Sequence, residues 1–273
     1  MKAFVSGGAG VIGRELVSRL VSQGVEVIVG DLQPRPEEFR EGVEYIHGDL
    51  NDLKTWPECD VFYHLAATFE RLEESPEHWE KNFRHNVQLS HHLLTLCPKE
   101  TRVVFASSYL VYGQYGKIEP RNLTGAAKFY TECELARLHP DSASARIYRV
   151  YGKGSRDVIS RWIRSLLREE EILLYNPNST YDYIYAGDVA QNLLTIKSGV
   201  HDLGTFVSTM VYDVVMILKD FFPNAKIKVD RHRRPGGEKW EDFLRAPLEG
   251  HTDLVDGIQK VIEYERGRMC VPS

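Results

Sequence analysis

The chain has 273 residues, of which 42% are hydrophobic and 27% are charged, and its formal net charge is −5. This composition is typical of a globular protein with a hydrophobic core, and the acidic balance argues against a nucleic-acid binder, which would carry a basic surplus. The four cysteines are scattered without metal-ligand spacing, no apolar run is long enough to span a membrane, and the first strand leaves no room for a cleavable signal. We therefore expect a cytoplasmic protein with reduced thiols.

The first structural signal is a glycine-rich turn that directly follows an apolar run. Residues 2–5 predict a strand and residues 14–22 a helix, and between them Gly7, Gly10 and Gly13 form the pattern G-x-x-G-x-x-G. Glycines in such a turn let backbone N–H groups approach a pyrophosphate, and the helix N-terminus adds partial positive charge. The context predicts dinucleotide binding, although glycine-rich turns without a ligand also join strands to helices.

A second predicted strand, residues 25–30, ends on Asp31. A carboxylate at about this distance from the glycines accepts hydrogen bonds from the adenosine ribose and repels a 2′-phosphate, which favours NAD over NADP. The alternative is that Asp31 only begins a surface turn ahead of Pro34 and Pro36.

Strands and helices alternate along the first half of the chain. Further strands are predicted at residues 43–47, 61–67, 102–108 and 144–148, and helices at residues 76–96 and 126–138. This alternation predicts an α/β fold with a Rossmann-type doubly wound parallel sheet, in which ligands bind beyond the carboxyl ends of the strands. We expect residues 7–13, Asp31, Asp49, residues 66–67 and residues 107–108 to line one cleft.

The pattern loosens after Tyr148. A helix is predicted at residues 158–168, a strand that leads into a helix at 181–190, a strand at 226–229 and a last helix at 253–265. We expect residues 149–181 and 221–273 to form a small C-terminal substrate-binding lobe, and residues 182–220 to return to the NAD-binding domain of residues 1–148.

These motifs jointly resemble the extended short-chain dehydrogenase/reductases, and among them the NAD-dependent nucleotide-sugar epimerase/dehydratase family. The matching segments are residues 7–13, 48–50, 64–67, 86–87, 107–113, 146–152, 181–190 and 234–236. The resemblance implies NAD as the cofactor, bound by Gly7, Gly10, Val11, Ile12, Gly13, Asp31, Leu32, Asp49, Leu50, Leu65, Ala66, Ala67, Asn86, Ser107, Lys128 and Tyr148.

The family oxidises a sugar hydroxyl with a tyrosine in a Tyr-x-x-x-Lys motif, while a nearby serine or threonine hydrogen-bonds the reacting oxygen. Ser108 matches that hydroxyl residue and Lys128 matches the lysine, but Thr124 stands where the tyrosine belongs. A threonine hydroxyl is far less acidic than a phenol, so it cannot serve as the base by the same route.

Three interpretations of Thr124 stay open. In the first interpretation, another group accepts the proton. Tyr109 is the preferred candidate for this group, and Tyr130 and Tyr112 are weaker candidates. Alternatively, the chain binds NAD and a sugar nucleotide without catalysis, because a fold does not fix a function. In the third interpretation, Thr124 only donates a hydrogen bond, and water or the substrate carries the proton.

The resemblance also narrows the reaction and the substrate contacts. A 4,6-dehydratase is less favoured, because the Asp-Glu pair of those enzymes is replaced by Tyr109 and Leu110, so epimerisation or keto-reduction remains. The family's asparagine before Val-Tyr-Gly is Arg149, and its arginine before Asp-Tyr-Ile is Tyr181. We hypothesise that Arg149, Arg156 and Arg234 hold the diphosphate, with a structural salt bridge as the alternative for Arg149.

The ten histidines predict no metal site, because His91 and His92 point to different helix faces and no ligand spacing occurs. The helices at residues 86–96 and 126–138 resemble those through which the family dimerises, so a homodimer is expected. We expect an NAD-dependent nucleotide-sugar epimerase or ketoreductase, with a catalytically silent NAD or nucleotide-sugar binding protein as the alternative.

Overall fold

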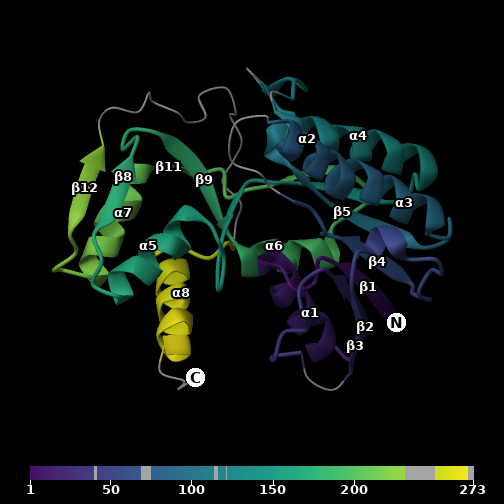
Figure 1. Cartoon of the computed structure of the whole chain (residues 1–273), viewed down its shortest axis with the longest axis horizontal. Coiled ribbons are helices and arrows are strands. Elements are labelled where there is room, and N and C mark those ends of the chain that lie inside the picture. Colours follow the sequence, from purple (N-terminus) through teal and green to yellow (C-terminus); the bar gives the residue numbers. More distant parts are fainter. Residues whose placement is uncertain (40–41, 69–74, 114–115, 121, 231–249, 270–273) are drawn as a thin grey trace. The chain divides into compact units, whose positions relative to one another are not determined.

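The structure is a computed structural model of the chain, and it describes residues 1–39, 42–68, 75–113, 116–120, 122–230 and 250–269 (Figure 1). The chain divides into two compact units, one of residues 1–147 and 189–203 and the other of residues 148–188 and 204–273. Within the described ranges, none of the helices combines the length and the apolar character that a membrane span requires.

The first unit is built on a seven-stranded parallel sheet with the order β10-β6-β5-β4-β1-β2-β3. Its strands are β1 (Lys2–Ser6), β2 (Glu26–Asp31), β3 (Val43–His47), β4 (Val61–His64), β5 (Arg102–Ser108), β6 (Ala143–Ile147) and β10 (Gly199–Leu203). Ser6 at the end of β1 pairs with Gly30 on one side and His64 on the other. The carboxyl ends of these strands therefore lie at one edge, and the predicted Rossmann-type fold is confirmed.

Helices cover both faces of this sheet (Figure 1). One face carries α2 (Pro76–Asn82), α3 (Leu89–Leu96) and α4 (Leu123–Leu138), with a π-helical segment, Phe83–Gln88, joining α2 to α3. The other face carries α1 (Val11–Ser22) and the part of α6 (Ala186–Thr195) that belongs to this unit. Buried apolar side chains from β1, β4, β5, α3 and α4 form the core that fixes the first of these layers.

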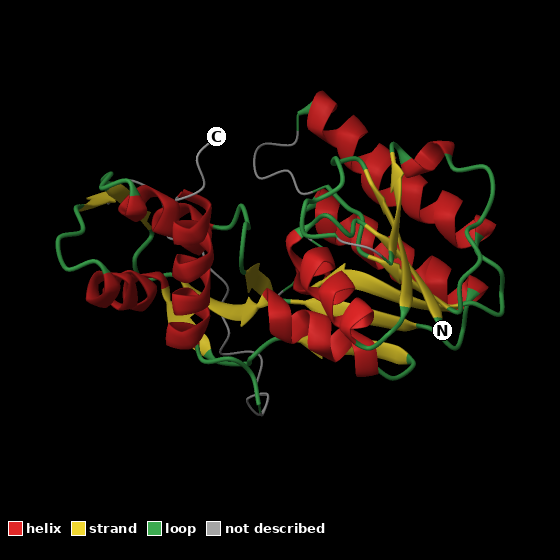
Figure 2. Cartoon of the chain, turned by 90° about the horizontal axis from the view of Figure 1, so that it is seen from below, coloured by secondary structure: helices red, strands yellow, loops and turns green. Residues whose placement is uncertain are grey.

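In its described residues the second unit has two small sheets and three helices of its own, which Figure 2 draws in yellow and red. One sheet has the order β11-β9-β7, and the other pairs β12 with β8. The bounds are β7 (Arg149–Tyr151), α5 (Val158–Leu167), β8 (Ile172–Tyr175), β9 (Thr180–Tyr185), β11 (Ser208–Met210), α7 (Val211–Phe221), β12 (Ile227–Asp230) and α8 (Leu254–Met269). A separate core that includes Tyr151, Ile163, Val214 and Ile258 holds these elements together.

The observed units and elements differ from the expected ones at several points. Residues 182–188 and 204–220, which were expected in the NAD-binding domain, lie in the second unit. Strand β9 pairs there with β7 and β11, and α7 contributes buried valines to that unit's core. The strand expected over residues 61–67 ends at His64. Helix α4 begins at Leu123, earlier than expected, because the Asn122 side chain caps it by accepting the N–H of Gly125 at 2.7 Å.

Candidate cofactor and active site

The turn between β1 and α1 leaves no room for side chains at its glycines. A Cβ on Gly13 would lie 2.4 Å from the carbonyl oxygen of Gly7, and one on Gly7 would lie 2.6 Å from the nitrogen of Ala66. Gly7 also has a φ of +74°, which L residues rarely adopt. Within the described residues, no side chain caps α1 at Gly10, so its first N–H groups suit an anion such as a pyrophosphate.

Asp31, at the end of β2, is buried against this turn. One of its carboxylate oxygens accepts the N–H of Ala9 at 2.9 Å, and the other accepts the N–H of Gln33 at 2.9 Å. These two bonds hold the carboxylate in one orientation beside the glycine turn, where the ribose contact is expected. The bond to Gln33 also closes a turn of the kind that the alternative describes, so the ribose contact stays a prediction.

Asp49 follows β3 at the same edge of the sheet. Its oxygens accept from Asn51 and from the guanidinium of Arg84, with the shortest Arg84 contact at 2.6 Å. Burial raises the pKa of the Asp49 carboxyl, but the hydrogen bonds from Arg84 and Asn51 outweigh it and lower this pKa to about 2. Asp49 is therefore an anchored anion at neutral pH.

A chain of buried hydrogen bonds runs behind the glycine turn. The Ser90 hydroxyl donates to the carbonyl of Asn86 at 2.7 Å, so it accepts from His64 Nε2 at 2.8 Å, which leaves His64 Nδ1 to accept from Ser6 Oγ at 2.8 Å. Burial, aided by the positive charge of Lys128, lowers the pKa of His64 to about 3, so the imidazole is neutral. The Asn86 side chain bonds both backbone groups of Thr68 and holds the segment after β4.

A second buried network lies beside the end of β5. Glu132 on α4 accepts from Arg146 at 2.6 and 3.0 Å and from the Ser107 hydroxyl. Arg146 also donates to the hydroxyl of Tyr112, which donates to Asp202 at 2.8 Å. The Ser107 hydroxyl is therefore engaged with Glu132, and Tyr112 packs as part of this network.

The three residues expected at the reacting position come from β5 and α4. Ser108 is half-buried at the end of β5, and its oxygen accepts the N–H of Leu110 at 3.2 Å. Thr124 and Lys128 are each 8% exposed. The amide of Asn82 donates to the Thr124 hydroxyl at 3.3 Å, and the Lys128 Nζ donates to the carbonyl of Ala106 at 2.7 Å.

The candidate tyrosines differ in their surroundings. Tyr109 lies half-buried in a 3-10 turn, Tyr109–Val111, that begins directly after Ser108. Tyr130 is 47% exposed on α4. Among the tyrosines that the sequence singled out, Tyr109 is the one adjacent to Ser108, so it stays the phenol to test.

The remaining expected cofactor residues vary in exposure. Leu50 is buried against Gly30, where a Cβ would lie 2.8 Å from a Leu50 methyl carbon. Leu65 and Ala66 are half-buried, as are Val11 and Ile12, whereas Leu32 and Ala67 are exposed. These positions follow β1 to β4 in turn, at the carboxyl edge of the sheet.

The expected substrate residues belong to the second unit. The Arg149 guanidinium lies over the Tyr181 ring, 3.6 Å from its centre, and Arg156 is exposed. Tyr148, which was expected to bind NAD and to end the domain of residues 1–148, instead belongs to this second unit, where it is buried against Gly204 and meets the Phe206 ring edge-on at 5.7 Å. Arg234, and the basic segment around it, lie outside the described residues.

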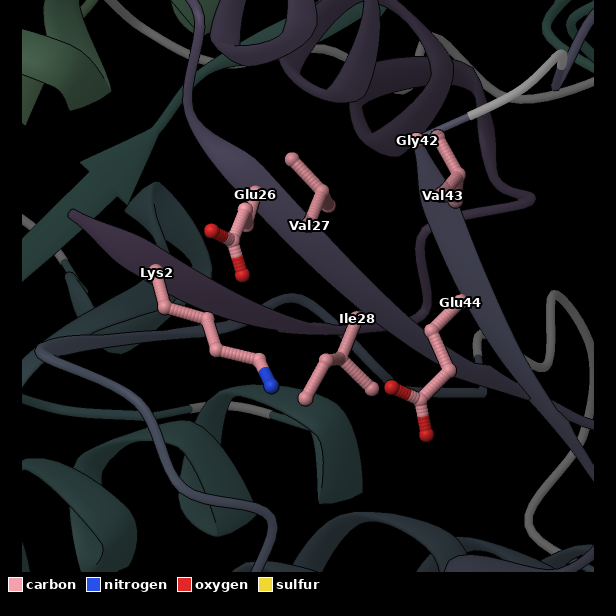
Figure 3. A pocket seen from close by; sticks show the side chains of 7 residues that line it. All are labelled: Lys2, Glu26, Val27, Ile28, Gly42, Val43 and Glu44. Atoms are coloured by element: carbon pink, nitrogen blue, oxygen red, sulfur yellow. The ribbon is translucent and has the colours of Figure 1, made fainter.

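A hollow of about 330 Å³ lies at the start of β1, β2 and β3, with the side chains of Lys2, Glu26, Ile28 and Glu44 around it (Figure 3). It is at the opposite edge of the sheet from the residues above, and we assign it no function. In the described ranges, His, Cys, Asp and Glu side chains form no group of three or more that could hold a metal ion.

The sequence interpretation missed Asn82, Arg84 and Ser90. Asn82, Asn86 and Ser90 are all buried, and they recur every four residues along one helical stretch. A polar stripe at that spacing on the face that packs inward is a signal that could have identified them.

Comparisons with known proteins agree on one family. The model of the NAD dependent epimerase/dehydratase family matches residues 3–201. A protein of Methanocaldococcus jannaschii, provisionally named a UDP-glucose 4-epimerase, is 27% identical over 96% of this chain and 97% of its own length.

Two solved structures are 25% identical to this chain and cover 98% of it. The complex of MoeE5 with UDP-glucose and NAD has a TM-score of 0.80 and is covered over 100% of its length. The NAD-dependent NDP-hexosamine 5,6-dehydratase TunA, which is involved in tunicamycin biosynthesis, has a TM-score of 0.82 and is covered over 98%.

Proposed function

Because the chain belongs to the NAD dependent epimerase/dehydratase family, we propose that it epimerises or reduces a sugar hydroxyl carbon of a nucleotide-diphosphate sugar. The family and its NAD dependence confirm the class of enzyme expected from the sequence, and a catalytically silent binding protein is not favoured. The observation that carries the proposal is the β1–α1 turn, whose glycines exclude side chains beside an uncapped helix N-terminus.

NAD fits the residues at the carboxyl edge of the first unit's sheet. The N–H groups at the start of α1 would hold the pyrophosphate, Asp31 the adenosine ribose and Asp49 the adenine. The tight turn, in which a Cβ on Gly7 or Gly13 would meet neighbouring backbone atoms, supports this assignment because it brings the start of α1 close to the end of β1. When bound, NAD takes a hydride from the sugar carbon and can return it.

We assign Ser108, Thr124 and Lys128 as the residues that lie beside the reacting hydroxyl group of the sugar. Ser108 and Thr124 offer hydroxyl groups, and Lys128 offers a buried amine on the same helix as Thr124. Dehydration stays less favoured than epimerisation or keto-reduction, because Tyr109 and Leu110 supply no carboxylate after Ser108.

The diphosphate of the substrate is assigned to Arg149, Arg156 and Arg234. The Tyr181 ring supports this assignment for Arg149, because a stacked guanidinium is held flat while its N–H edges can still donate to phosphate oxygens.

We also propose a cytoplasmic homodimer that associates through the helices around α3 and α4. Three exposed aromatic side chains support this face: Trp79, Phe83 and Tyr130, of which the first two stack at 5.6 Å. Size-exclusion chromatography with light scattering tests it, and a monomer at micromolar concentration would contradict it.

The test of the activity is incubation of the protein with NAD and UDP-, GDP-, CDP- and dTDP-sugars. We expect an altered sugar from at least one class, or NADH absorbance when the returning step is blocked. If every sugar is recovered unchanged and no NADH forms, the silent alternative replaces the proposal.

A further inference from the structure

The Asp49 carboxylate accepts four hydrogen bonds from the folded chain itself. One oxygen accepts from the backbone N–H of Asn51 at 3.0 Å and from its side-chain amide at 2.9 Å. The other oxygen accepts from Arg84 Nε at 3.2 Å and from a terminal nitrogen of the same guanidinium at 2.6 Å. An ionised carboxylate offers about four lone pairs, so these bonds fill it. A further donor, such as the 6-amino group of adenine, therefore has to displace one of them.

The two pairs of bonds differ in how easily they can be given up. The bonds from Asn51 are part of the local fold, because Asp49 caps the short 3-10 helix Leu50–Asp52 through the Asn51 N–H. The bonds from Arg84 come from a distant part of the chain and from a side chain that is 50% exposed. Solvent screens such an ion pair, so it adds little stability. Arg84 is therefore the donor that an adenine amino group displaces first.

The backbone at Arg84 is fixed on both sides, although its side chain reaches into solvent. Arg84 lies in the π-helical segment that joins α2 to α3. Before it, the Asn82 amide donates to the Thr124 hydroxyl at 3.3 Å. After it, the Asn86 side chain bonds both backbone groups of Thr68. The guanidinium can therefore swing away from Asp49 while the helical segment stays in place.

Two exposed acids offer the released guanidinium a new partner. The hydrogen bonds and the charge of Asp49 raise the pKa of Arg84, and the charges of Asp52 and Glu80 add to this rise, because both lie near the guanidinium. Glu80 also precedes Arg84 by four residues on a continuous helical stretch, a spacing at which side chains can meet. The guanidinium therefore keeps an acidic surrounding after it leaves Asp49.

We propose that Arg84 competes with the 6-amino group of adenine for Asp49, and that NAD binding moves its guanidinium off this carboxylate. The inference rests on the proposed function, which assigns Asp49 to the adenine, and it adds Arg84 as a residue that sets the preference for the base. The exchange breaks no covalent bond. An adenine N–H replaces the guanidinium N–H groups at the same oxygen, and the guanidinium turns toward Asp52, Glu80 or water.

The test compares 5′-AMP with purine riboside 5′-monophosphate, which differs from AMP only in lacking the 6-amino group. Both nucleotides carry the same phosphate charge. The ratio of their dissociation constants therefore reports the contact of the amino group and is independent of the net charge that a variant removes. Isothermal titration calorimetry on the full chain measures both constants. For the wild type we expect a preference for AMP, reduced by the cost of displacing Arg84.

Substitutions at Arg84 separate competition from charge. Arg84→Ala is expected to raise the preference for AMP by about two- to fivefold, because the amino group no longer displaces an exposed ion pair. Arg84→Lys keeps the cation without the two-pronged fork and should give an intermediate value. Arg168→Ala is the matched control, because Arg168 forms a similar exposed pair with Glu170 at 2.8 and 3.0 Å. A preference that is unchanged or lower in Arg84→Ala would overturn the proposal.

Asp49→Ala tests the acceptor itself. We expect this variant to bind AMP and the purine analogue equally well, and a preference that survives would place the amino group elsewhere and overturn the proposal. If neither nucleotide binds to the wild type although NAD does, the adenine is held elsewhere and the proposal falls. Failure of NAD itself to bind would instead defeat the proposed function.

An NMR measurement on the wild type follows the guanidinium directly, without a change at the Asp49 cap. In protein labelled with ¹⁵N-arginine, the Arg84 Nε–H signal is identified by its loss in Arg84→Lys. We expect saturation with AMP to shift this signal, because its hydrogen bond to Asp49 is broken, and saturation with the purine analogue to leave it in place. An Arg84 signal that does not respond to AMP would overturn the proposal.

Discussion

The guanidinium of Arg149 lies 3.6 Å from the centre of the Tyr181 ring. Arg149 is on β7 and Tyr181 on β9, which are neighbouring parallel strands. The family resemblance expects an asparagine at the first position and an arginine at the second. Relative to the family pattern, the cation therefore stands on the neighbouring strand, and its guanidinium stacks on the ring at the position where the family has arginine.

Arg149→Ala is expected to weaken nucleotide-sugar binding by about tenfold or more, because charged hydrogen bonds to the diphosphate are lost. Tyr181→Leu should cause a smaller loss, since it removes only the stacking that holds the guanidinium flat. Isothermal titration calorimetry with UDP-glucose measures both, with NAD affinity unchanged. Arg161→Ala, at an exposed site on α5, is the control, and equal affinities in all three variants would disprove the assignment.

Gly13→Ala is expected to destabilise the protein by about 1–3 kcal/mol, because the new methyl group meets the backbone of Gly7 and Gly8. NAD binding should be lost with it, since the turn must open to make room. Gly267→Ala in α8 is the matched control, because its Cβ meets nothing within 4 Å and alanine favours a helix. Equal melting temperatures for the two variants would contradict this account of the turn.

Glu132→Gln is expected to cost about 3–5 kcal/mol of unfolding free energy, because it leaves the buried charge of Arg146 without its carboxylate partner. The exposed pair of Arg168 and Glu170 offers the comparison. Glu170→Gln should give no measurable change, since solvent screens that pair. Urea denaturation measures both variants, and a stable Glu132→Gln protein would show that the network near β5 contributes little.

His64 makes stability depend on pH in a definite direction. Burial depresses the pKa of the folded imidazole from 6.5 to about 3, so its contribution is fully present above pH 6.5 and is lost as the pH falls toward 3. The slope from this group is at most about 1.4 kcal/mol per pH unit. We expect the urea midpoint of the wild type to fall more steeply between pH 6.5 and 5 than that of His64→Gln, and parallel slopes would contradict the expectation.

The strands and the glycine turn of the first unit could be predicted from the sequence, because each depends on a short stretch of neighbouring residues. Strands β3 and β5 have the predicted bounds, and the glycine turn precedes α1 as expected. The polar pairs around the candidate site could not be predicted from the sequence, because their members are far apart along the chain. Asn82 contacts Thr124, and Tyr112 contacts Asp202, only in the folded protein. Strand β7 was not predicted because it has only three residues, and β10 was not predicted because it lacks an apolar run.

The roles assigned to the cofactor, reacting and diphosphate residues remain predictions, as does the substrate-binding role of the second unit. Local sequence places a residue at the end of a strand, but the ligand that meets it there depends on groups far along the chain.

The most direct measurement follows a deuterium label from sugar to cofactor. Protein is incubated with NAD and with UDP-sugars whose hexose carbons carry deuterium, and the recovered cofactor is analysed by mass spectrometry. An enzyme that oxidises a sugar carbon would place the deuterium on the nicotinamide and, in epimerisation, return it to the sugar. We therefore predict deuterium in reduced cofactor that is trapped by quenching during turnover, or an altered sugar that has kept its deuterium. Unlabelled cofactor beside unchanged sugar, across UDP-, GDP-, CDP- and dTDP-sugars, would contradict it.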